Sequence, residues 1–443
     1  MFALSLKLNR HRGAVVALVI LLAVVLASPA LMYGSDKKKK AGTPPPAAPP
    51  KLDIDTSKLV WPNPPNIARV RWLDYYTGMK IDRSPAPTTK KKQSWMDRVA
   101  GTKQEDNTDK LKTFPWQFIG PYGLAIDSKG LVYVADQRVG AVFIINTEAH
   151  DATLIKNGAD AHFGWINGVA IDDGDRLFVS DGKMRRVLIF NPKHQIEGQI
   201  AEGLIDPVGL AIDNENRFLY VVDEQADQVL VYDADSLKLL RKIGTAVPPA
   251  KKHTLTTPGD FSAPTNVAVD HDGNVYVTDT LNDRVEIFDA EGNFISTFGK
   301  PGDGPGYFAR PKGIAIDCDG HIWVADQMQD RVMVFNREGQ LLTYIGDTHA
   351  NGPGQFKALV AIAIDKQNRV FTTEQYPGRM QMFRYITEDE AAKERAKRAA
   401  DAEKTADAHR GVSSDTSKPD AAAPAPKPAD TPAPKPVEAP PSH

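Results

Sequence analysis

Gly313-Ile-Ala-Ile-Asp317 is a short apolar strand that ends in an aspartate, and the chain repeats this pattern five more times. The other copies are Gly123-Leu-Ala-Ile-Asp127, Gly168-Val-Ala-Ile-Asp172, Gly209-Leu-Ala-Ile-Asp213, Asn266-Val-Ala-Val-Asp270 and Ala361-Ile-Ala-Ile-Asp365. Further apolar strands follow each copy, and the unit recurs about every 45 residues, as the blades of a propeller do. Because one blade cannot bury both of its faces, blades must close into a ring. The sequence therefore predicts an all-β, six-bladed β-propeller.

Two longer stretches indicate the type of repeat. They are Asp279-Thr-Leu-Asn-Asp-Arg-Val-Glu-Ile-Phe288 and Asp326-Gln-Met-Gln-Asp-Arg-Val-Met-Val-Phe335, and Gly302-Asp-Gly-Pro-Gly-Tyr-Phe-Ala-Arg-Pro-Lys-Gly313 leads into a blade in the same style. These motifs closely resemble the NHL repeat. The resemblance implies a six-bladed NHL-type propeller over residues 114–386. It implies little about activity, since NHL propellers serve as binding platforms, as sensor domains and occasionally as enzymes.

Residues 1–35 have the pattern of an export signal. Lys7, Arg10 and Arg12 precede an uninterrupted apolar run at residues 13–27. Extended to residue 33, the segment matches a transmembrane helix that crosses a hydrocarbon core of ~30 Å, and read shorter it is a signal peptide. Both readings keep the positive end in the cytoplasm. We expect a protein held in the membrane through this segment and facing the periplasm, or one exported to the cell envelope.

The segments that flank the repeats have compositions of their own. Residues 36–58 are rich in Lys and Pro and predict a solvated linker. The sixth blade has three apolar strands of its own, whereas residues 67–75 alternate as a strand does. We therefore expect segment 59–78 to supply the missing strand and close the ring, followed by a flexible crossing over residues 79–113.

The chain after the repeats is polar. Thr387-Glu-Asp-Glu390 has the form of a capping box and predicts a short charged helix over residues 387–411. Residues 412–443 are mostly Ala, Pro, Lys and Ser and predict a disordered tail.

The charge and cysteine content narrow the class of partner. Acidic residues outnumber basic ones in 114–386, although the whole chain has a net charge of only −2. A nucleic-acid partner requires a basic surface, so we exclude nucleic acid. Cys318 is the single cysteine, so no internal disulfide supports the domain.

Acidic residues also begin the loops between the second and third strands, and an arginine often follows five residues later. The pairs are Asp181 and Arg186, Asp279 and Arg284, and Asp326 and Arg331. Taken singly, each pair looks like a binding site. Because the spacing recurs from blade to blade, we interpret the pairs as structural, with each aspartate tying its own loop.

The positions at which blades differ are the candidates for ligand binding. They lie after the entry proline of a blade or in the loop between its second and third strands, at the expected mouth of the central channel. The set consists of Tyr122, Asn167, Thr265, Asn266, Lys312, Gln137, Gln225, Gln327, Gln375 and Tyr376. Trp165 is either a further aromatic of the mouth or a packing residue between blades. Amides, aromatics and one lysine indicate a hydrogen-bonding mouth that suits a peptide, a glycan or a loop of a protein.

The sequence does not favour an enzyme. The peptide-amidating lyase resembles an NHL propeller and places metal-binding histidines directly after the entry proline of several blades, where this chain has no histidine. His162, His253 and His349 lie in loops that enter blades, but their spacing does not match. We predict no catalytic residue, metal ligand or cofactor.

Three functions stay open. The first is a membrane-tethered or exported scaffold that binds a protein or peptide partner. The second is a sensor or carrier that binds a small molecule or a glycan at the channel mouth. The third is a metal-dependent lyase.

Overall fold

The computed structural model describes residues 55–77, 117–158, 160–245, 257–346 and 351–412. The expected export segment, linker, crossing and tail lie outside these residues, except for residues 55–58 of the linker and residue 412 of the tail. Among the helices of the described part, none has both the length and the apolar character that crossing a membrane requires.

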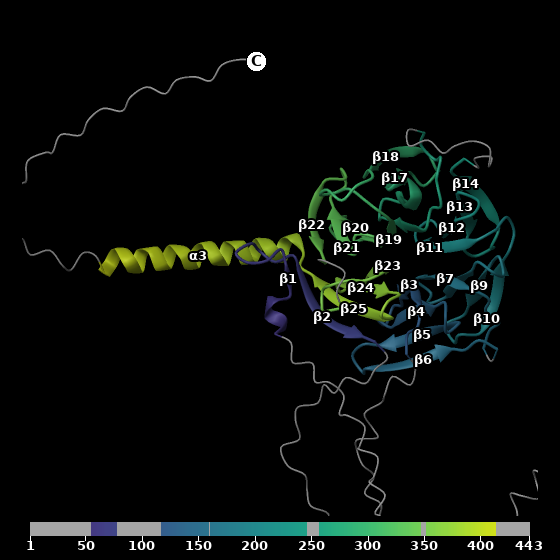
Figure 1. The fold of residues 1–443 in the computed structure, drawn as a ribbon, viewed down its shortest axis with the longest axis horizontal. Helices are drawn as coiled ribbons and strands as arrows, with labels where there is room; N and C mark the ends of the chain where they lie inside the picture. Colours follow the sequence, from purple (N-terminus) through teal and green to yellow (C-terminus); the bar gives the residue numbers. More distant parts are fainter. Residues whose placement is uncertain (1–54, 78–116, 159, 246–256, 347–350, 413–443) are drawn as a thin grey trace, which may run out of the picture. The chain divides into compact units, whose positions relative to one another are not determined.

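Six antiparallel sheets form the propeller, one for each repeat (Figure 1). Blade 1 consists of β3 (Pro121–Ile126), β4 (Val132–Asp136), β5 (Ala141–Asn146) and β6 (Asp151–Ile155). Blade 2 consists of β7 (Ile166–Ile171), β8 (Leu177–Asp181), β9 (Arg186–Phe190) and β10 (Ile196–Ile200). Blade 3 consists of β11 (Pro207–Asp213), β12 (Phe218–Asp223), β13 (Gln228–Asp233) and β14 (Leu239–Ile243).

The next two blades repeat this order. Blade 4 consists of β15 (Asn266–Val269), β16 (Val275–Asp279), β17 (Arg284–Phe288) and β18 (Phe294–Phe298), with the 3-10 helix η3 (Thr280–Asn282) between its second and third strands. Blade 5 consists of β19 (Pro311–Ile316), β20 (Ile322–Asp326), β21 (Arg331–Phe335) and β22 (Leu341–Ile345). The all-β, six-bladed prediction is confirmed.

Blade 6 combines strands from before the first blade with strands from after the fifth. The chain supplies β23 (Leu359–Ile364), β24 (Arg369–Glu374) and β25 (Arg379–Tyr385), and the fourth and fifth strands are β2 (Val70–Tyr76) and β1 (Val60–Trp61), which follow the 3-10 helix η1 (Thr56–Lys58). β2 lies beside β25 in Figure 1 although the two are far apart in sequence. The buried indole of Trp72 donates to Gln381 Oε1 at 3.0 Å. A strand from before the repeats thus holds the last blade, at the position expected for residues 67–75.

Burial follows the strand order within each blade. The second strand is buried along its whole length, as in β4 and β20, whereas the outermost strand alternates, as in β22. The apolar clusters join neighbouring blades, for example Val142 of blade 1 with Leu188 of blade 2. Burying such a side chain contributes about 1.5–3 kcal/mol, so stability comes from packing of blade on blade.

The predicted C-terminal helix is present as α3 (Glu388–Val412). The amide of Glu390 donates to Thr387 Oγ1 at 3.3 Å, and the amide of Thr387 donates to Glu390 Oε2 at 3.0 Å. Both halves of the capping box are therefore formed. From residue 388 to residue 405, the side chains of α3 are mostly exposed, apart from Ala391.

Candidate functional site

The loops at the two ends of the strands form two different surfaces. The mouth face consists of the loops that enter each blade and the loops between second and third strands, at residues 117–120, 137–140, 156–158, 160–165, 182–185, 201–206, 224–227, 257–265, 280–283, 299–310, 327–330, 351–358 and 375–378. The turn face consists of the remaining turns, at residues 127–131, 147–150, 172–176, 191–195, 214–217, 234–238, 270–274, 289–293, 317–321, 336–340 and 365–368. Because consecutive strands are antiparallel, the two sets lie at opposite ends of the blades.

The first strands of neighbouring blades pack backbone against backbone around the channel. They approach so closely that a Cβ on Gly123 would lie 2.5 Å from the carbonyl oxygen of Asn167. A Cβ on Gly168 would lie closer still to the carbonyl oxygen of Val208. Only glycine permits this approach. The first strands of all six blades, with Gly123 and Gly168 among the lining residues, surround a cavity of about 260 Å³.

Two of the predicted mouth residues meet across blade 6. Lys312 Nζ of blade 5 lies 3.5 Å from Tyr122 Oη of blade 1 and 5.5 Å from the centre of its ring. Burial lowers the pKa of Lys312, opposed by the charge of Glu224. Burial raises the pKa of Tyr122, and Glu224 and Asp206 raise it further, so the phenol keeps its proton. Blade 3 therefore places acidic groups within electrostatic range of the lysine and the tyrosine.

Amides form a chain that crosses four blades. Gln375 Nε2 donates to Gln137 Oε1 at 3.2 Å, Gln137 Nε2 donates to Asn167 Oδ1 at 2.6 Å, and Asn167 Nδ2 donates to the carbonyl oxygen of Pro207 at 3.1 Å. Asn167 is almost fully buried. Its amide therefore connects blades, whereas Gln137 and Gln375 are only half-buried.

The two candidates of blade 4 contribute to the ring. Thr265 is buried, and its hydroxyl lies 2.7 Å from that of Thr280 and 3.3 Å from the carbonyl oxygen of Lys312. Asn266 Oδ1 accepts from the amide of Val267, the next residue, at 2.9 Å. Thr265 is thus closed to a ligand, whereas Asn266 is half-buried and lines the central cavity.

Second-strand hydroxyls tie alternate pairs of blades. Ser180 of blade 2 donates to the carbonyl oxygen of Val208 at 2.6 Å, and Thr278 of blade 4 donates to that of Lys312 at 2.8 Å. Thr373 of blade 6 donates to the carbonyl oxygen of Tyr122 at 2.5 Å. Each acceptor is the mouth residue of the next blade, so these bonds position the backbone that carries Lys312 and Tyr122.

The remaining mouth candidates lie further out. Gln225 Nε2 donates to Asp206 Oδ2 at 3.1 Å, and the backbone amide of Gln327 donates to the carbonyl oxygen of Arg310 at 2.9 Å. Tyr376 is 56% exposed, with Lys357 Nζ 4.5 Å from the centre of its ring.

The aspartates of the predicted structural pairs bind their own loops and also the entry loop of the same blade. Within their own loops, Asp181 accepts from the amide of Met184, Asp279 from the side-chain amide of Asn282, and Asp326 from the amides of Met328 and Gln329. From the entry loops, Asp181 accepts from the amides of Gly164 and Trp165, Asp279 from Ser262, and Asp326 from Ala309 and Arg310. The arginines behave differently. Arg284 Nε binds Asp279 Oδ2 at 2.8 Å, whereas Arg186 donates to the carbonyl oxygen of His162 and to Gln199, and Arg331 lies over Tyr344. Because backbone amides already occupy the carboxylates of Asp181 and Asp326, their arginines pair with other groups.

Sequence reasoning named Tyr376 and considered Trp165, but it missed the other exposed apolar side chains that form a ring on the mouth face. Every blade contributes at least one: Ile119, Trp165, Met184, Ile205, Leu281, Met328 and Tyr376. They surround Lys312 and Tyr122, because they lie in the loops of all six blades. Of the large apolar side chains exposed in the described residues, none lies on the turn face. The signal in the sequence is weak, since Leu281 and Met328 simply stand two residues after a loop aspartate.

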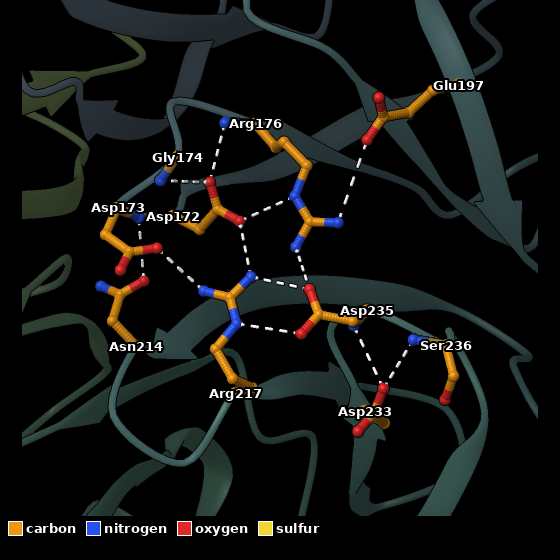
Figure 2. Close-up of polar contacts among 10 residues, drawn as sticks. All are labelled: Asp172, Asp173, Gly174, Arg176, Glu197, Asn214, Arg217, Asp233, Asp235 and Ser236. Carbon is orange, nitrogen blue, oxygen red and sulfur yellow. Dashed lines mark hydrogen bonds and ion pairs between the residues drawn. The ribbon is translucent and has the colours of Figure 1, made fainter.

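The turn face pairs its charges. Figure 2 shows Arg176 of blade 2 and Arg217 of blade 3 between acidic groups of both blades. Arg217 Nη2 binds Asp172 Oδ2 at 3.1 Å and Asp235 Oδ1 at 2.9 Å, and Arg176 Nη2 binds Asp235 Oδ1 at 2.8 Å. Burial opposes ionisation of Asp172, but hydrogen bonds from Arg176 and Arg217 hold its pKa below the usual value. The network joins two blades.

The arginines of the two faces differ in this respect. Arg176, Arg217 and Arg337, on the turn face, each form an ion pair. The mouth face carries Arg138, Arg185 and Arg310, and none of them has an ion-pair partner in the part of the chain that the structure describes.

The described residues contain no group of three or more His, Cys, Asp and Glu side chains that is placed to hold a metal ion. His162 is exposed, and His253 and His349 lie outside the described residues.

Comparisons with known proteins agree with this architecture. Residues 254–321 match a family described as a 6-bladed beta-propeller. A probable peptidyl-alpha-hydroxyglycine alpha-amidating lyase of Caenorhabditis elegans is 30% identical over 25% of this chain, and NHL repeat-containing protein 2 of Bos taurus is 24% identical over 45% of it. The matched regions span 31% and 25% of those two proteins.

A solved structure shows the same fold. It is a Bacteroides thetaiotaomicron protein of unknown function with a TM-score of 0.50 and 17% identity, matched over 60% of this chain and 70% of that one. The sequence matches, the repeats and the six sheets together support one conclusion. The chain is a six-bladed β-propeller related to the NHL repeat-containing proteins.

Proposed function

We propose that this protein is a binding platform that docks a protein partner on its mouth face. The observation that carries the proposal is the ring of exposed apolar side chains, one or more from each blade. Soluble proteins rarely expose contiguous apolar surface, and such surface marks sites of interaction. Protein interfaces are enriched in Trp, Tyr, Met and Arg, all of which the mouth face exposes.

The turn face supports this choice by contrast. It is built from the same repeats, yet it exposes no large apolar side chain among the described residues, and its arginines are paired. A general tendency of the repeat to expose apolar groups would have affected both faces. The other exposed large apolar side chains of the described residues lie on the outer strands: Leu73, Ile196, Leu240, Phe294, Ile295, Leu342 and Tyr344. The asymmetry between the two loop faces therefore favours the mouth face over the turn face, and the outer strands need a control of their own.

Site-specific photocrosslinking in cells tests the proposal. A photoreactive amino acid replaces Leu281, Met328 or Tyr376 on the mouth face, and Lys193, Glu291 or Gln367 on the turn face. We expect one protein adduct of the same mass at the three mouth positions and none at the turn positions. Equal adducts from both faces, or none from either, would contradict the proposal.

A pair of variants makes the test quantitative. Leu281→Ser with Met328→Ser removes apolar surface from the mouth face, and Leu240→Ser with Leu342→Ser removes comparable surface from the outer strands β14 and β22. With the photoreactive group at Tyr376, we expect the first variant to lose most of the adduct and the second to keep it. The reverse pattern would place the interface on the outer strands.

We propose further that the N-terminal segment tethers the platform to the membrane, or exports it, so that the mouth face is presented in the cell envelope. The basic residues and apolar run of residues 1–35 support this. Protease treatment of intact and of permeabilised cells tests it. Protection of the propeller after permeabilisation of the outer barrier alone would count against an extracytoplasmic location.

The second candidate is a sensor or carrier for a small molecule at the same mouth. The cavity that the first strands line and the half-buried side chain of Lys312 favour it. The partial match to an amidating lyase raises a third reading, catalysis with a metal, which metal analysis of the purified protein addresses directly. A small ligand without any protein adduct would move the assignment to the second candidate.

A further inference from the structure

We propose that the partner presents an acidic loop, and that a carboxylate of this loop enters the mouth and binds Lys312 and Tyr122. The inference rests on the proposed docking function and names the chemistry of the partner. Three features of the mouth carry it. They are a cation without an ion pair among the described residues, a hydrogen-bond donor beside that cation, and an acidic sector, Asp206 and Glu224 of blade 3, that limits where an anion can bind.

Lys312 is the unpaired cation. Its side chain is only partly exposed at the entrance of the channel, and its nearest polar contact is Tyr122 Oη at 3.5 Å. No carboxylate of the described residues lies within ion-pair distance of Nζ. A charge withdrawn from water is costly unless it is paired, so the site gains most from a ligand that brings a negative charge.

Tyr122 supplies the second contact. Its hydroxyl keeps its proton because burial raises the pKa of the phenol. It can therefore donate to one carboxylate oxygen while the ammonium of Lys312 donates to the same group. Charge-assisted hydrogen bonds of this kind are the strong ones in proteins. Thr373 and Thr278 fix the backbone of both residues, so the two donors are held in place before the ligand arrives.

The acidic sector of blade 3 directs the carboxylate to the opposite side of the mouth. The amide of Glu224 donates to the carbonyl oxygen of Asp206 at 3.0 Å, so the two acidic residues lie together. Burial raises the pKa of Glu224, and the charge of Lys312 opposes that rise. A carboxylate near Glu224 would be repelled, whereas one near Lys312 and Arg310 of blade 5 would be attracted.

The loops around Lys312 point to a protein loop as the source of the carboxylate. The mouth face carries charges of both signs, and its acidic residues slightly outnumber its basic ones. Arg138, Arg185 and Arg310 are exposed there and have no ion pair among the described residues, so acidic side chains of a partner would pair with them individually. The apolar ring in which they stand suits a protein surface better than a free small anion.

Fluorescence anisotropy with two labelled hexapeptides tests the proposal on the purified full chain. The probes are hexaglutamate and hexaglutamine. We expect hexaglutamate to bind at least about tenfold more tightly, since a hydrogen bond to a charged group is worth at least a factor of about ten. Equal affinity for the two peptides would overturn the proposal.

Four variants locate the bound charge. Lys312→Met should lose about tenfold in affinity for hexaglutamate, Lys312→Arg should recover most of it, and Tyr122→Phe should lose severalfold while keeping the ring. Glu224→Gln should bind hexaglutamate more tightly than the wild type, because it removes a repulsion. Lys193→Met, an exposed lysine on the turn face, is the matched control and should have no effect. Loss in the control equal to that in Lys312→Met would show general charge attraction and overturn the assignment to the mouth.

The two proposals can fail separately. Photocrosslinking through Met328 and Leu281 reports on the docking face whether or not hexaglutamate binds. Acetate serves as a competitor against hexaglutamate, and we expect it to compete only at concentrations far above that of the peptide. Competition at equal concentration would identify a free small carboxylate as the ligand and overturn the loop of a partner as its source.

Discussion

The mouth face and the turn face come from the same repeats, yet they differ in the pairing of their arginines and in the exposure of their apolar side chains. The turn face joins Arg176 and Arg217 to the acids of two blades (Figure 2). On the mouth face, Arg138, Arg185 and Arg310 have no ion pair within the part of the chain that the structure describes. The mouth face also exposes seven large apolar side chains, and the turn face exposes none among the described residues. We infer that one face contributes stability and the other is kept available for binding. Substitutions on the turn face should therefore affect folding, and those on the mouth face should affect association.

Gly168 should break this division of roles most strongly, because it lies at the mouth and yet serves the fold. Gly168→Ala places a Cβ against the carbonyl oxygen of Val208, a backbone atom that cannot move aside easily. We expect the free energy of unfolding to fall by about 3 kcal/mol, the upper part of the range for overpacking. Urea denaturation measures this change.

Gly174→Ala is the matched control on the turn face. A Cβ there meets Asp172 Oδ1 at 3.4 Å, which is ordinary contact. We expect a change in unfolding free energy within about 0.5 kcal/mol. Similar losses for the two variants would mean that the close backbone approach at Gly168 adds no particular constraint on stability.

Arg217→Met tests the pairing of the turn face. The substitution leaves the buried carboxylate of Asp172 with one partner fewer, and removing a partner from a buried acceptor costs roughly 1–3 kcal/mol. Arg310→Met, on the mouth face, removes no ion pair and should leave the unfolding free energy within about 0.5 kcal/mol of the wild type. Thermal or urea unfolding of both proteins sharpens the comparison, and a larger loss in Arg310→Met would invert it.

The smallest expected effect concerns pH. His321 Nδ1 lies 3.1 Å from Asp317 Oδ2, and this contact raises the pKa of His321 above 6.5 despite its burial. Because the folded pKa is raised, the contribution is fully present below pH 6.5 and is lost as the pH rises through the folded value. We expect His321→Gln to cost about 1 kcal/mol at pH 6 and less at pH 8. A cost that stays constant between these values would show that the ion pair adds no stability.

The ring could be predicted from the sequence because its signal is repeated. The strand-ending aspartates recur at propeller spacing, and the shortage of strands in the sixth blade pointed to residues 67–75, where β2 is found. Repetition also made it possible to treat Asp181, Asp279 and Asp326 as ties of their own loops. Because the same strand and turn pattern recurs in every blade, the fold could be predicted from one sequence.

The sequence predicts where the candidate residues stand in each blade, but not which groups they contact. Tyr122 and Asn167 stand at equivalent positions, yet Asn167 is used to bind the carbonyl oxygen of Pro207 in the next blade. Such a partner depends on how two blades dock, which no local pattern encodes. The apolar ring was missed for a related reason, since a single Leu281 or Met328 in a loop is unremarkable until six loops are brought to one face.

The closure of blade 6 has a mechanical consequence. Trp61 of β1 pairs with Val70, where β2 begins, and Val70 pairs with Tyr385, where β25 ends, so the chain enters and leaves at the same end of the sheet. Tension applied through both chain ends would peel β2 from β25 one residue pair at a time, the arrangement of a zipper. The amide of Ile386 donates to the carbonyl oxygen of Arg69, and the Arg69 side chain binds Glu388, at the point where peeling would start. The contacts of Arg69 with Ile386 and Glu388 thus hold blade 6 together at the end that is pulled.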